Sequence, residues 1–255
     1  MYQELAPIVS NAEVMPGIYL MRVHTTIASL ARPGQFAMLA CDNQNLTVLR
    51  RPISIHEAQS HVAGFLFAVI GAGTAWLAQR QPGESIDLIG PAGNGFSYDP
   101  NSRKLLLIAG GMGIAPLTYL AREAINQGRQ VVILAGAKTA KQIYPAALLP
   151  PGCEYFTATE DGSAGEKRLV TALLTQHVDW ADQIFVCGPL PMFKTLAGDF
   201  GPLLKNKSVQ VSLEVRMGCG MGFCYACTIR TQKGLQQVCK DGPVFRMPDI
   251  IWDAL

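Results

Sequence analysis

The sequence predicts a multidomain protein in which an antiparallel β-barrel precedes an α/β domain with a parallel sheet and a small, cysteine-rich C-terminal domain. Three observations predict this order. Short apolar runs separated by glycine and proline turns fill residues 1–98, strand and helix patterns alternate over residues 99–210, and four of the seven cysteines lie in residues 211–255. We therefore expect three domains with these boundaries.

The N-terminal part contains apolar runs of strand length, at intervals typical of an antiparallel barrel or a sandwich. They lie at residues 17–20, 36–39, 64–69 and 85–89. After the third run, Gly71, Ala72 and Gly73 precede Thr74, and a helix-like stretch follows at residues 75–78. Thr74 is a residue type expected at the N-cap of such a helix.

The middle part has the buried strands and connecting helices of a parallel sheet. Strands are expected at residues 105–108, 131–134, 155–157 and 184–186, with a helix at residues 117–127. Residues 110–116, GGMGIAP, join the first strand to this helix. Such a turn directs backbone N–H groups and a helix N-terminus toward a pyrophosphate. The motif lacks the last glycine of the full G-x-G-x-x-G pattern, so an ordinary tight turn remains the alternative.

The last part contains the most specific motif, four cysteines with the spacing C-x4-C-x2-C-x11-C. They are Cys219, Cys224, Cys227 and Cys239. This spacing is that of plant-type [2Fe–2S] proteins, in which thiolates hold both irons. Glycines at positions 218, 220 and 222 let backbone N–H groups approach the cluster sulfurs. Structural zinc, which more often uses two short cysteine pairs, and unliganded thiols are the alternatives.

Other strand ends contain groups suited to a nucleotide. Arg51 and Ser54 supply a guanidinium and a hydroxyl, and a phosphate could bridge Arg51 and the helix that begins near Thr74. A surface ion pair and an ordinary helix cap are the alternatives. Asp161 and Cys187 end two further strands, where a turn residue and a small core residue are the alternatives.

The composition excludes several classes of protein. Apolar residues make up 49% of the chain and charged residues 16%, against about 25% charged in an average globular protein, which excludes a disordered chain or a coiled coil. A net charge of +2 without blocks of like charge argues against nucleic-acid and membrane partners. The N-terminus has no targeting pattern, so we expect a cytoplasmic protein. The four histidines are dispersed, and Glu214 and Arg216 are expected to pair at the surface.

The motifs RPIS, GAGT, GPAGNGF, GGMGIAPL, TEDGS, CGPLPM and MGCGMGFCYAC…VCKDGPVF occur in this order over nearly the whole chain. Together they resemble the ferredoxin–NADP reductase superfamily and, within it, the electron-transfer subunits of class 1B dihydroorotate dehydrogenases. The resemblance implies an N-terminal FAD-binding barrel, an NAD-binding α/β domain and a C-terminal [2Fe–2S] domain. Ile53 departs from the wider superfamily, in which a tyrosine commonly stacks on the flavin.

The resemblance also implies which residues bind each group. The expected FAD residues are Arg51, Pro52, Ile53, Ser54, Leu66, Phe67, Ala68, Gly73 and Thr74. The expected NAD residues are Gly111, Gly113, Pro116, Asp161, Cys187 and Gly188, with Cys187 in the nicotinamide pocket. The cluster ligands are Cys219, Cys224, Cys227 and Cys239. No general acid or base is expected.

The implied function is electron transfer between an FMN-containing dihydroorotate dehydrogenase catalytic subunit and NAD+, in the de novo synthesis of UMP, within a heterotetramer of two copies of each subunit. Nicotinamide exchanges two electrons as a hydride and the cluster one at a time, so a flavin is needed between them. One alternative is a small subunit of an NADH-dependent ferredoxin–NADP or sulfide dehydrogenase. Another is a zinc-stabilised interaction module with an inactive reductase fold.

The choice between NAD and NADP is less clear from the residues than from the resemblance, which implies NAD. Lys138, Lys141 and Tyr144 follow the second strand of the α/β domain, with no nearby acid to hold a ribose 2′-hydroxyl. Cations at this place could accept a 2′-phosphate. We expect NAD, because solvated lysines are the commoner explanation.

Overall fold

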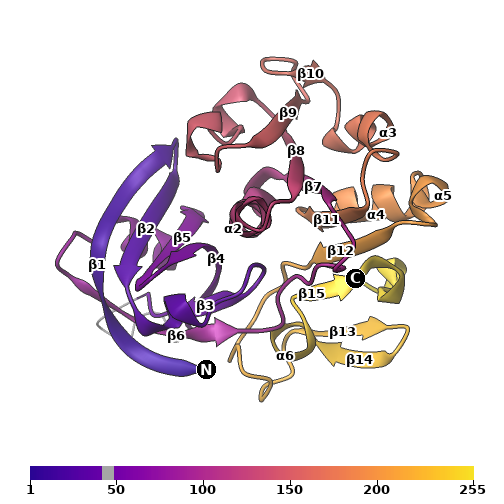
Figure 1. Cartoon of the computed structure of the whole chain (residues 1–255). Helices are drawn as coiled ribbons and strands as arrows, with labels where there is room; N and C mark the ends of the chain where they lie inside the picture. Colours follow the sequence, from indigo (N-terminus) through magenta and orange to yellow (C-terminus); the bar gives the residue numbers. More distant parts are fainter. Residues whose placement is uncertain (42–48) are drawn as a thin grey trace.

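The computed structural model describes residues 1–41 and 49–255, and its first unit is a closed antiparallel barrel (Figure 1). The strands are joined in the order β1-β2-β5-β4-β3-β6. Closure leaves no free sheet edge, and it decides between the barrel and the sandwich that the sequence left open. The strands are β1 (Tyr2–Met15), β2 (Ile18–His24), β3 (Phe36–Leu39), β4 (Arg51–Gln59), β5 (Val62–Ala68) and β6 (Ser85–Ala92).

A short helix, α1 (Ala72–Ala78), follows β5, and its N-cap is Gly71. The prediction that Thr74 is the N-cap is therefore wrong. Thr74 lies in the first turn, where its Oγ1 accepts hydrogen bonds from the N–H groups of Ile70 at 3.0 Å and Gly71 at 3.3 Å. A threonine three residues after the cap can reach back in this way, so the residue type alone does not locate the cap.

The second unit is a seven-stranded sheet in the order β10-β9-β8-β7-β11-β12-β15. All neighbouring strands are parallel except β15, which runs antiparallel to β12. Helices cover both faces of such a sheet, so its central strands are continuous apolar runs, as the sequence indicates. The strands are β7 (Lys104–Gly110), β8 (Gln130–Ala137), β9 (Cys153–Thr159), β10 (Glu166–Lys167), β11 (Gln183–Cys187), β12 (Ser208–Ser212) and β15 (Val244–Arg246).

Helix α2 (Ile114–Asn126) lies between the sheet and the barrel, as Figure 1 shows. Its Leu117 and Leu120 share an apolar core with strand β7, whereas Tyr119 belongs to the core of the barrel. The Tyr119 hydroxyl donates a hydrogen bond to the carbonyl of Ala31 at 3.0 Å. The opposite face of the sheet is covered by α3 (Leu174–His177), α4 (Leu190–Gly198) and α5 (Gly201–Leu204). One helix thus fixes the barrel against the sheet.

The C-terminal segment packs against both larger units. It contains the hairpin of β13 (Thr228–Thr231) and β14 (Gly234–Gln237), then α6 (Val238–Asp241), before β15 joins the large sheet. Strand β12 runs across the expected boundary at residue 210. No helix among residues 1–41 and 49–255 has the length and apolar character needed to cross a membrane.

Candidate functional site

A cavity of about 710 Å³ lies between the barrel and the sheet. Gly17 in the β1–β2 turn, and Leu66 and Ala68 at the end of β5, line it on the barrel side. On the sheet side, the residues that follow β7, β8, β9 and β11 line it. These are the carboxyl ends of parallel strands, where nucleotides bind in open α/β sheets.

The turn after β7 touches the turn after β11 beneath this cavity. A Cβ atom on Gly113 would lie 2.0 Å from the carbonyl oxygen of Cys187, so only glycine permits this approach. Gly111 lines the cavity, whereas Gly113, Pro116, Cys187 and Gly188 are buried behind its surface. The structure therefore brings five of the six expected NAD residues together.

Glu214 lines the cavity next to the buried Cys187, whose Sγ lies 3.8 Å from Glu214 Oε1. The two meet because Cys187 pairs with Ser212 across β11 and β12, two residues before Glu214. Desolvation raises the pKa of the Cys187 thiol well above its usual value. Desolvation by the surrounding protein also raises the pKa of the Glu214 carboxyl group, although its side chain is accessible to solvent from the cavity.

The expectation that Glu214 pairs with Arg216 is not met. No ion pair joins the two among the described residues. Sequence reasoning missed Glu214 as a site residue, and the only signal was its place directly after a buried strand.

Charged side chains gather at the other end of the cavity. Lys138, Glu160 and Arg168 line it from the loops after β8, β9 and β10. The Glu160 N–H donates a hydrogen bond to the carbonyl of Ala137 at 3.1 Å, which holds Glu160 beside the end of β8. Arg168 is paired with Glu166 at 2.9 Å. An acid therefore stands at the end of the cavity where the sequence indicated only cations.

Asp161, the sixth expected NAD residue, is exposed and does not line this cavity. Its Oδ1 accepts hydrogen bonds from the N–H of Ser163 at 2.9 Å and from the Ser163 hydroxyl at 2.6 Å. These bonds lower the pKa of Asp161. The carboxylate thus faces its own turn, and the neighbouring Glu160 faces the cavity.

On the barrel, Arg51 and helix α1 lie together, as the phosphate-site hypothesis requires. A Cβ atom on Gly73 would lie 3.0 Å from Arg51 Nε. Arg51 also donates to the carbonyl of Leu49 at 2.6 Å, which orients its guanidinium. Pro52, Ile53 and Ser54 continue β4 and are half-buried.

The three expected FAD residues of β5 do not face the same way. Leu66 and Ala68 line the cavity. Phe67 points into the barrel core, where its ring stacks with Tyr19 at a centroid distance of 6.1 Å. Only the backbone of Phe67 is available to a ligand in the cavity, because alternate side chains of a strand point to opposite faces.

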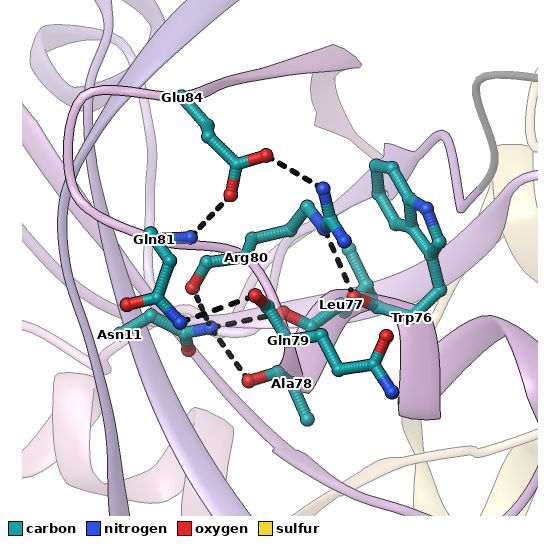
Figure 2. Close-up of polar contacts among 8 residues, drawn as sticks. All are labelled: Asn11, Trp76, Leu77, Ala78, Gln79, Arg80, Gln81 and Glu84. Carbon is teal, nitrogen blue, oxygen red and sulfur yellow. Dashed lines mark hydrogen bonds and ion pairs between the residues drawn. The ribbon is translucent and has the colours of Figure 1, made fainter.

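Helix α1 is held to the barrel at its C-terminal end (Figure 2). Asn11 Nδ2, from β1, donates to the carbonyls of Leu77 at 2.9 Å, Ala78 at 3.3 Å and Arg80 at 2.9 Å. The Arg80 guanidinium lies 4.2 Å from the centre of the Trp76 ring. The three hydrogen bonds from Asn11 satisfy carbonyls that a helix end leaves free, so they tie the C-terminal end of α1 to β1.

The four cysteines of the motif meet as two pairs. The Cys219 N–H donates to Cys224 Sγ at 3.4 Å, and the Cys239 N–H donates to Cys227 Sγ at 3.4 Å. Among the described residues, no three His, Cys, Asp or Glu side chains lie close enough together to hold a single metal ion. Two pairs suit a two-iron cluster, in which each iron takes two thiolates.

Backbone N–H groups point at the sulfur of Cys219 from Met221 at 3.4 Å and from Phe223 at 3.3 Å. Burial opposes ionisation, but these hydrogen bonds lower the pKa of Cys219 to about 6. Burial and the neighbouring Cys227 raise the pKa of Cys239 to about 12. A thiolate that accepts several N–H bonds is the environment of an iron–sulfur ligand.

Two family models match the chain in these regions. "Oxidoreductase NAD-binding domain" matches residues 107–197, and "Iron-sulfur cluster binding domain of dihydroorotate dehydrogenase B" matches residues 214–251. The second match spans all four cysteines and includes Glu214. The matches confirm NAD and an iron–sulfur cluster among the expected cofactors.

Curated relatives decide the family. The dihydroorotate dehydrogenase B (NAD(+)) electron transfer subunit of Desulforamulus reducens is 37% identical, over 94% of this chain and 95% of the relative. The subunit of the same name from a Geobacillus species is 34% identical, over 98% of this chain and 99% of the relative. The chain belongs to this family of electron transfer subunits. The predicted family and oxidoreductase class are confirmed.

The fold is also that of solved flavin-dependent reductases. An NADH-dependent reduced ferredoxin–NADP oxidoreductase, described in a study of flavin-based electron bifurcation, aligns with a TM-score of 0.82 and 26% identity, over 98% of this chain and 91% of that one. A ferredoxin–NADP+ reductase from Neisseria gonorrhoeae aligns with a TM-score of 0.65 and 19% identity, over 80% of this chain and 92% of that one. The predicted fold class is confirmed, and the zinc-module alternative is not favoured.

Proposed function

We propose that this electron transfer subunit passes electrons between an FMN-containing dihydroorotate dehydrogenase catalytic subunit and NAD+, by way of a [2Fe–2S] cluster and FAD, in the synthesis of UMP. The observation that supports the proposal is that the nucleotide cavity and the cysteine pairs both lie against the same barrel. The nucleotide cavity opens on one side of it. Cys227 and Cys239 share an apolar core with β3 and β6 of the barrel, and Gly220, between Cys219 and Cys224, contacts Met38 of β3. A chain that only stored iron or only bound a nucleotide would not need both.

The cavity residues divide into two ends with different tasks. At the end near β11, the close contact of Gly113 with Cys187 leaves no side chain between the two turns, and we place the nicotinamide ring there. Glu214 lines this end of the cavity with a carboxyl group that can hydrogen-bond a carboxamide or a ring edge. At the other end, Lys138 and Glu160 face the place where an adenosine ribose would lie.

The residues proposed to hold FAD are Arg51, Pro52, Ile53, Ser54, Leu66, Phe67, Ala68, Gly73 and Thr74, with Phe67 acting through its backbone. The approach of Arg51 to Gly73 supports a phosphate at that point, because a guanidinium and backbone N–H groups both suit an anion. When bound, FAD supplies the conversion between hydride exchange and single-electron exchange. The chain's part is to hold the nucleotide cavity on one side of β4 and the loop of residues 219–224, the cysteine loop, on the other.

The cysteine loop also has a surface suited to a protein partner. Phe223 and Tyr225 are 77% and 70% exposed, and Met221 lies beside them. Aromatic residues and methionine are enriched in protein interfaces. We therefore place the catalytic subunit on this surface, in a heterotetramer with two copies of each chain.

The proposed domains are residues 1–98 for FAD, 99–210 for NAD and 211–255 for the cluster. Strand β12 crosses the second boundary, and β15 of the last domain joins the large sheet. We place the protein in the cytoplasm. None of the seven cysteines is in a disulfide bond, which suits a compartment that keeps thiols reduced.

Reconstitution with the catalytic subunit tests the proposal. The purified chain should contain FAD, iron and sulfide, and the mixture should couple dihydroorotate oxidation to NAD+ reduction, followed as NADH absorbance. Ferredoxin replaces the catalytic subunit in a parallel assay. Coupling to ferredoxin but not to dihydroorotate would contradict the proposal in favour of a ferredoxin-linked dehydrogenase.

A further inference from the structure

The side chain of Met38, in β3, lies directly against the cysteine loop. A Cβ atom on Gly220 would lie 2.5 Å from Met38 Cγ and 2.6 Å from Met38 Sδ. Gly220 has a φ of +70°, a conformation that glycine adopts without strain. It stands between the paired Cys219 and Cys224. Met38 is completely buried, so this contact excludes water from the space between the barrel and the loop.

Met38 also lies beside the strand proposed to hold FAD. In the β3–β4 ladder its partner is Pro52, one residue after Arg51. Side chains of directly opposed residues in an antiparallel pair lie on the same face of the sheet. Pro52 and Met38 therefore share one face, and Met38 is the side chain that links this part of β4 to Gly220.

The other cysteine pair is held by a second contact with the barrel. Asn94, which follows β6, donates from Nδ2 to the carbonyls of Lys240 at 3.2 Å and Asp241 at 3.0 Å. The backbone N–H of Asn94 donates a hydrogen bond to the carbonyl of Gly242 at 2.5 Å. Cys239, Cys227 and Met38 belong to one apolar core. The hydrogen bonds of Asn94 fix the segment of Cys239. The loop of Cys219 is held to the following segment by a hydrogen bond from Gln237 Nε2 to the carbonyl of Gly222 at 3.0 Å, and it meets the barrel through its contact with Met38.

We propose that Met38 is a positioning residue that sets the spacing and packing between the FAD site and the cysteine loop, and so controls the rate of electron exchange between them. This inference rests on the proposed function. When bound, FAD would take a hydride from NADH, leaving NAD+, and would pass one electron to a ferric iron of the [2Fe–2S] cluster. A second electron would follow once the cluster has passed the first to the catalytic subunit or to ferricyanide, and oxidised FAD would then be regained with release of its proton to water. Electron tunnelling weakens steeply with distance and with unfilled space. The Met38 contact therefore affects the electron exchange between FAD and the cluster and not the hydride exchange between NADH and FAD.

A side chain that merely filled the core would behave differently. Methionine is a common gap-filler, and in that role its truncation would lower stability without separating the two redox steps. The test therefore compares the rates of two steps in the same loaded protein, together with measurements that do not depend on turnover.

The variants are Met38→Leu, Met38→Val and Met38→Ala, each loaded with FAD and cluster. Met21→Ala is the control, because Met21 is an equally buried methionine in the barrel core and belongs to a different apolar cluster. Anaerobic mixing with NADH gives the rate of flavin bleaching. Freeze-quenched EPR gives the rate at which the reduced cluster forms. Hydrogen exchange of the amides at 219–224 reports the order of the loop.

We expect flavin bleaching to keep its wild-type rate in every variant. Cluster reduction should slow severalfold in Met38→Ala, less in Met38→Val and little in Met38→Leu, which conserves volume. Exchange at residues 219–224 should rise in the same order, and Met21→Ala should match the wild type in both. If Met38→Ala loses its cofactors, the valine and leucine variants decide the result in the same way.

Cluster reduction at the wild-type rate in loaded Met38→Ala, or a rate that does not follow side-chain size, would overturn the inference. The proposed function would still stand in that case. A wild-type chain that binds no FAD or cluster, or that NADH does not reduce, would instead contradict the proposed function itself.

Discussion

The thiol of Cys187 lies 3.8 Å from Oε1 of Glu214, at the end of the cavity between barrel and sheet. Both groups have raised pKa values, because the protein around them disfavours their charged forms. The pair meets only through the side-by-side ends of β11 and β12. This contact gives the first prediction.

Glu214→Gln should stabilise the protein increasingly as pH rises. A carboxyl whose pKa is raised in the folded state holds its proton more tightly there than in the unfolded chain. The protonated carboxyl group therefore contributes to the stability of the fold below pH 4.5, its ordinary pKa. This contribution is lost as the pH rises through the raised pKa of the folded state. Glutamine cannot ionise, so the difference in Tm between variant and wild type should grow over that window and then level off.

Calorimetry from pH 4.5 to pH 8 measures this difference. Glu154→Gln, an exposed carboxylate on β9, controls for the loss of one negative charge. A difference that shrinks as pH rises would mean that the folded protein favours the ionised form of Glu214.

NADH should be preferred to NADPH, and Glu160 should contribute to the preference. Glu160 lines the cavity beside the end of β8, where a carboxylate can accept a hydrogen bond from a ribose 2′-hydroxyl and repel a 2′-phosphate. Glu160→Gln should raise kcat/KM for NADPH by about tenfold, equivalent to about 1.4 kcal/mol. Lys138→Gln should lower it, because Lys138 is a cation on the same lining.

Dye reduction with each nucleotide gives these ratios. Asp161→Asn is the matched comparison, because this neighbouring carboxylate faces Ser163 rather than the cavity. If Asp161→Asn changes the ratio and Glu160→Gln does not, the nucleotide contacts the turn instead of the cavity end assigned to it.

Arg51→Ala should weaken the retention of FAD. A hydrogen bond to a charged group contributes about 1.5–3 kcal/mol, so the Kd should rise by about tenfold to a hundredfold. Arg50→Ala is the control on the neighbouring residue, since Arg50 is paired with Asp87 at 2.6 Å. Flavin fluorescence during titration of the apoprotein gives both constants. Equal losses in the two variants would remove Arg51 from the flavin site.

Cys227→Ser should lower or abolish the iron and sulfide content. A hard alkoxide is a poorer ligand for the cluster than a soft thiolate. Cys153→Ser should retain both, because Cys153 lies on β9 and bonds to the carbonyl of Pro150 at 3.2 Å. Colorimetric iron and sulfide assays on the purified variants decide the assignment. A Cys153→Ser protein without iron, beside an intact Cys227→Ser, would reverse it.

The sequence predicted the sheet better than the barrel, for a physical reason. Central strands such as β7 and β11 are buried on both faces, so they are continuous apolar runs. Strand β1 was missed because its exposed residues include Leu5, Pro7 and Val9, so apolar and polar residues do not alternate along it. One of its partners, β6, is about 80 residues away in the sequence, so this pairing leaves no local signal.

The site shows the same limit. Cysteine spacing selected the four thiols that the structure brings together as two pairs, because three of them are close neighbours in the sequence. Which of the adjacent residues Glu160 and Asp161 lines the cavity was not predictable from the sequence. The hydrogen bond from the Ser163 N–H to Asp161 holds the Asp161 carboxylate within the turn. Glu214 likewise acquires its place from the pairing of β12 with β11, which the sequence of residues 208–214 does not specify.

Cys224→Ser should separate the two halves of the electron route. Hydride exchange needs the cavity and the flavin-binding strands, which belong to the barrel and the sheet, whereas Cys224 lies in the exposed loop beside Cys219. A variant that folds and retains FAD should therefore still reduce ferricyanide with NADH at close to the wild-type rate. It should fail to couple dihydroorotate oxidation to NAD+ reduction when mixed with the catalytic subunit.

The deciding measurement is the ratio of these two activities, each normalised to bound FAD. Arg51→Ala provides the contrast, because loss of flavin should lower both activities together and leave their ratio unchanged. Exposure of Phe223 and Tyr225 in the same loop means that binding to the catalytic subunit must be checked separately, by co-elution. If Cys224→Ser binds the catalytic subunit, contains no iron and still couples dihydroorotate to NAD+, electrons reach FAD without the cluster. The route through the cysteine loop would then have to be abandoned.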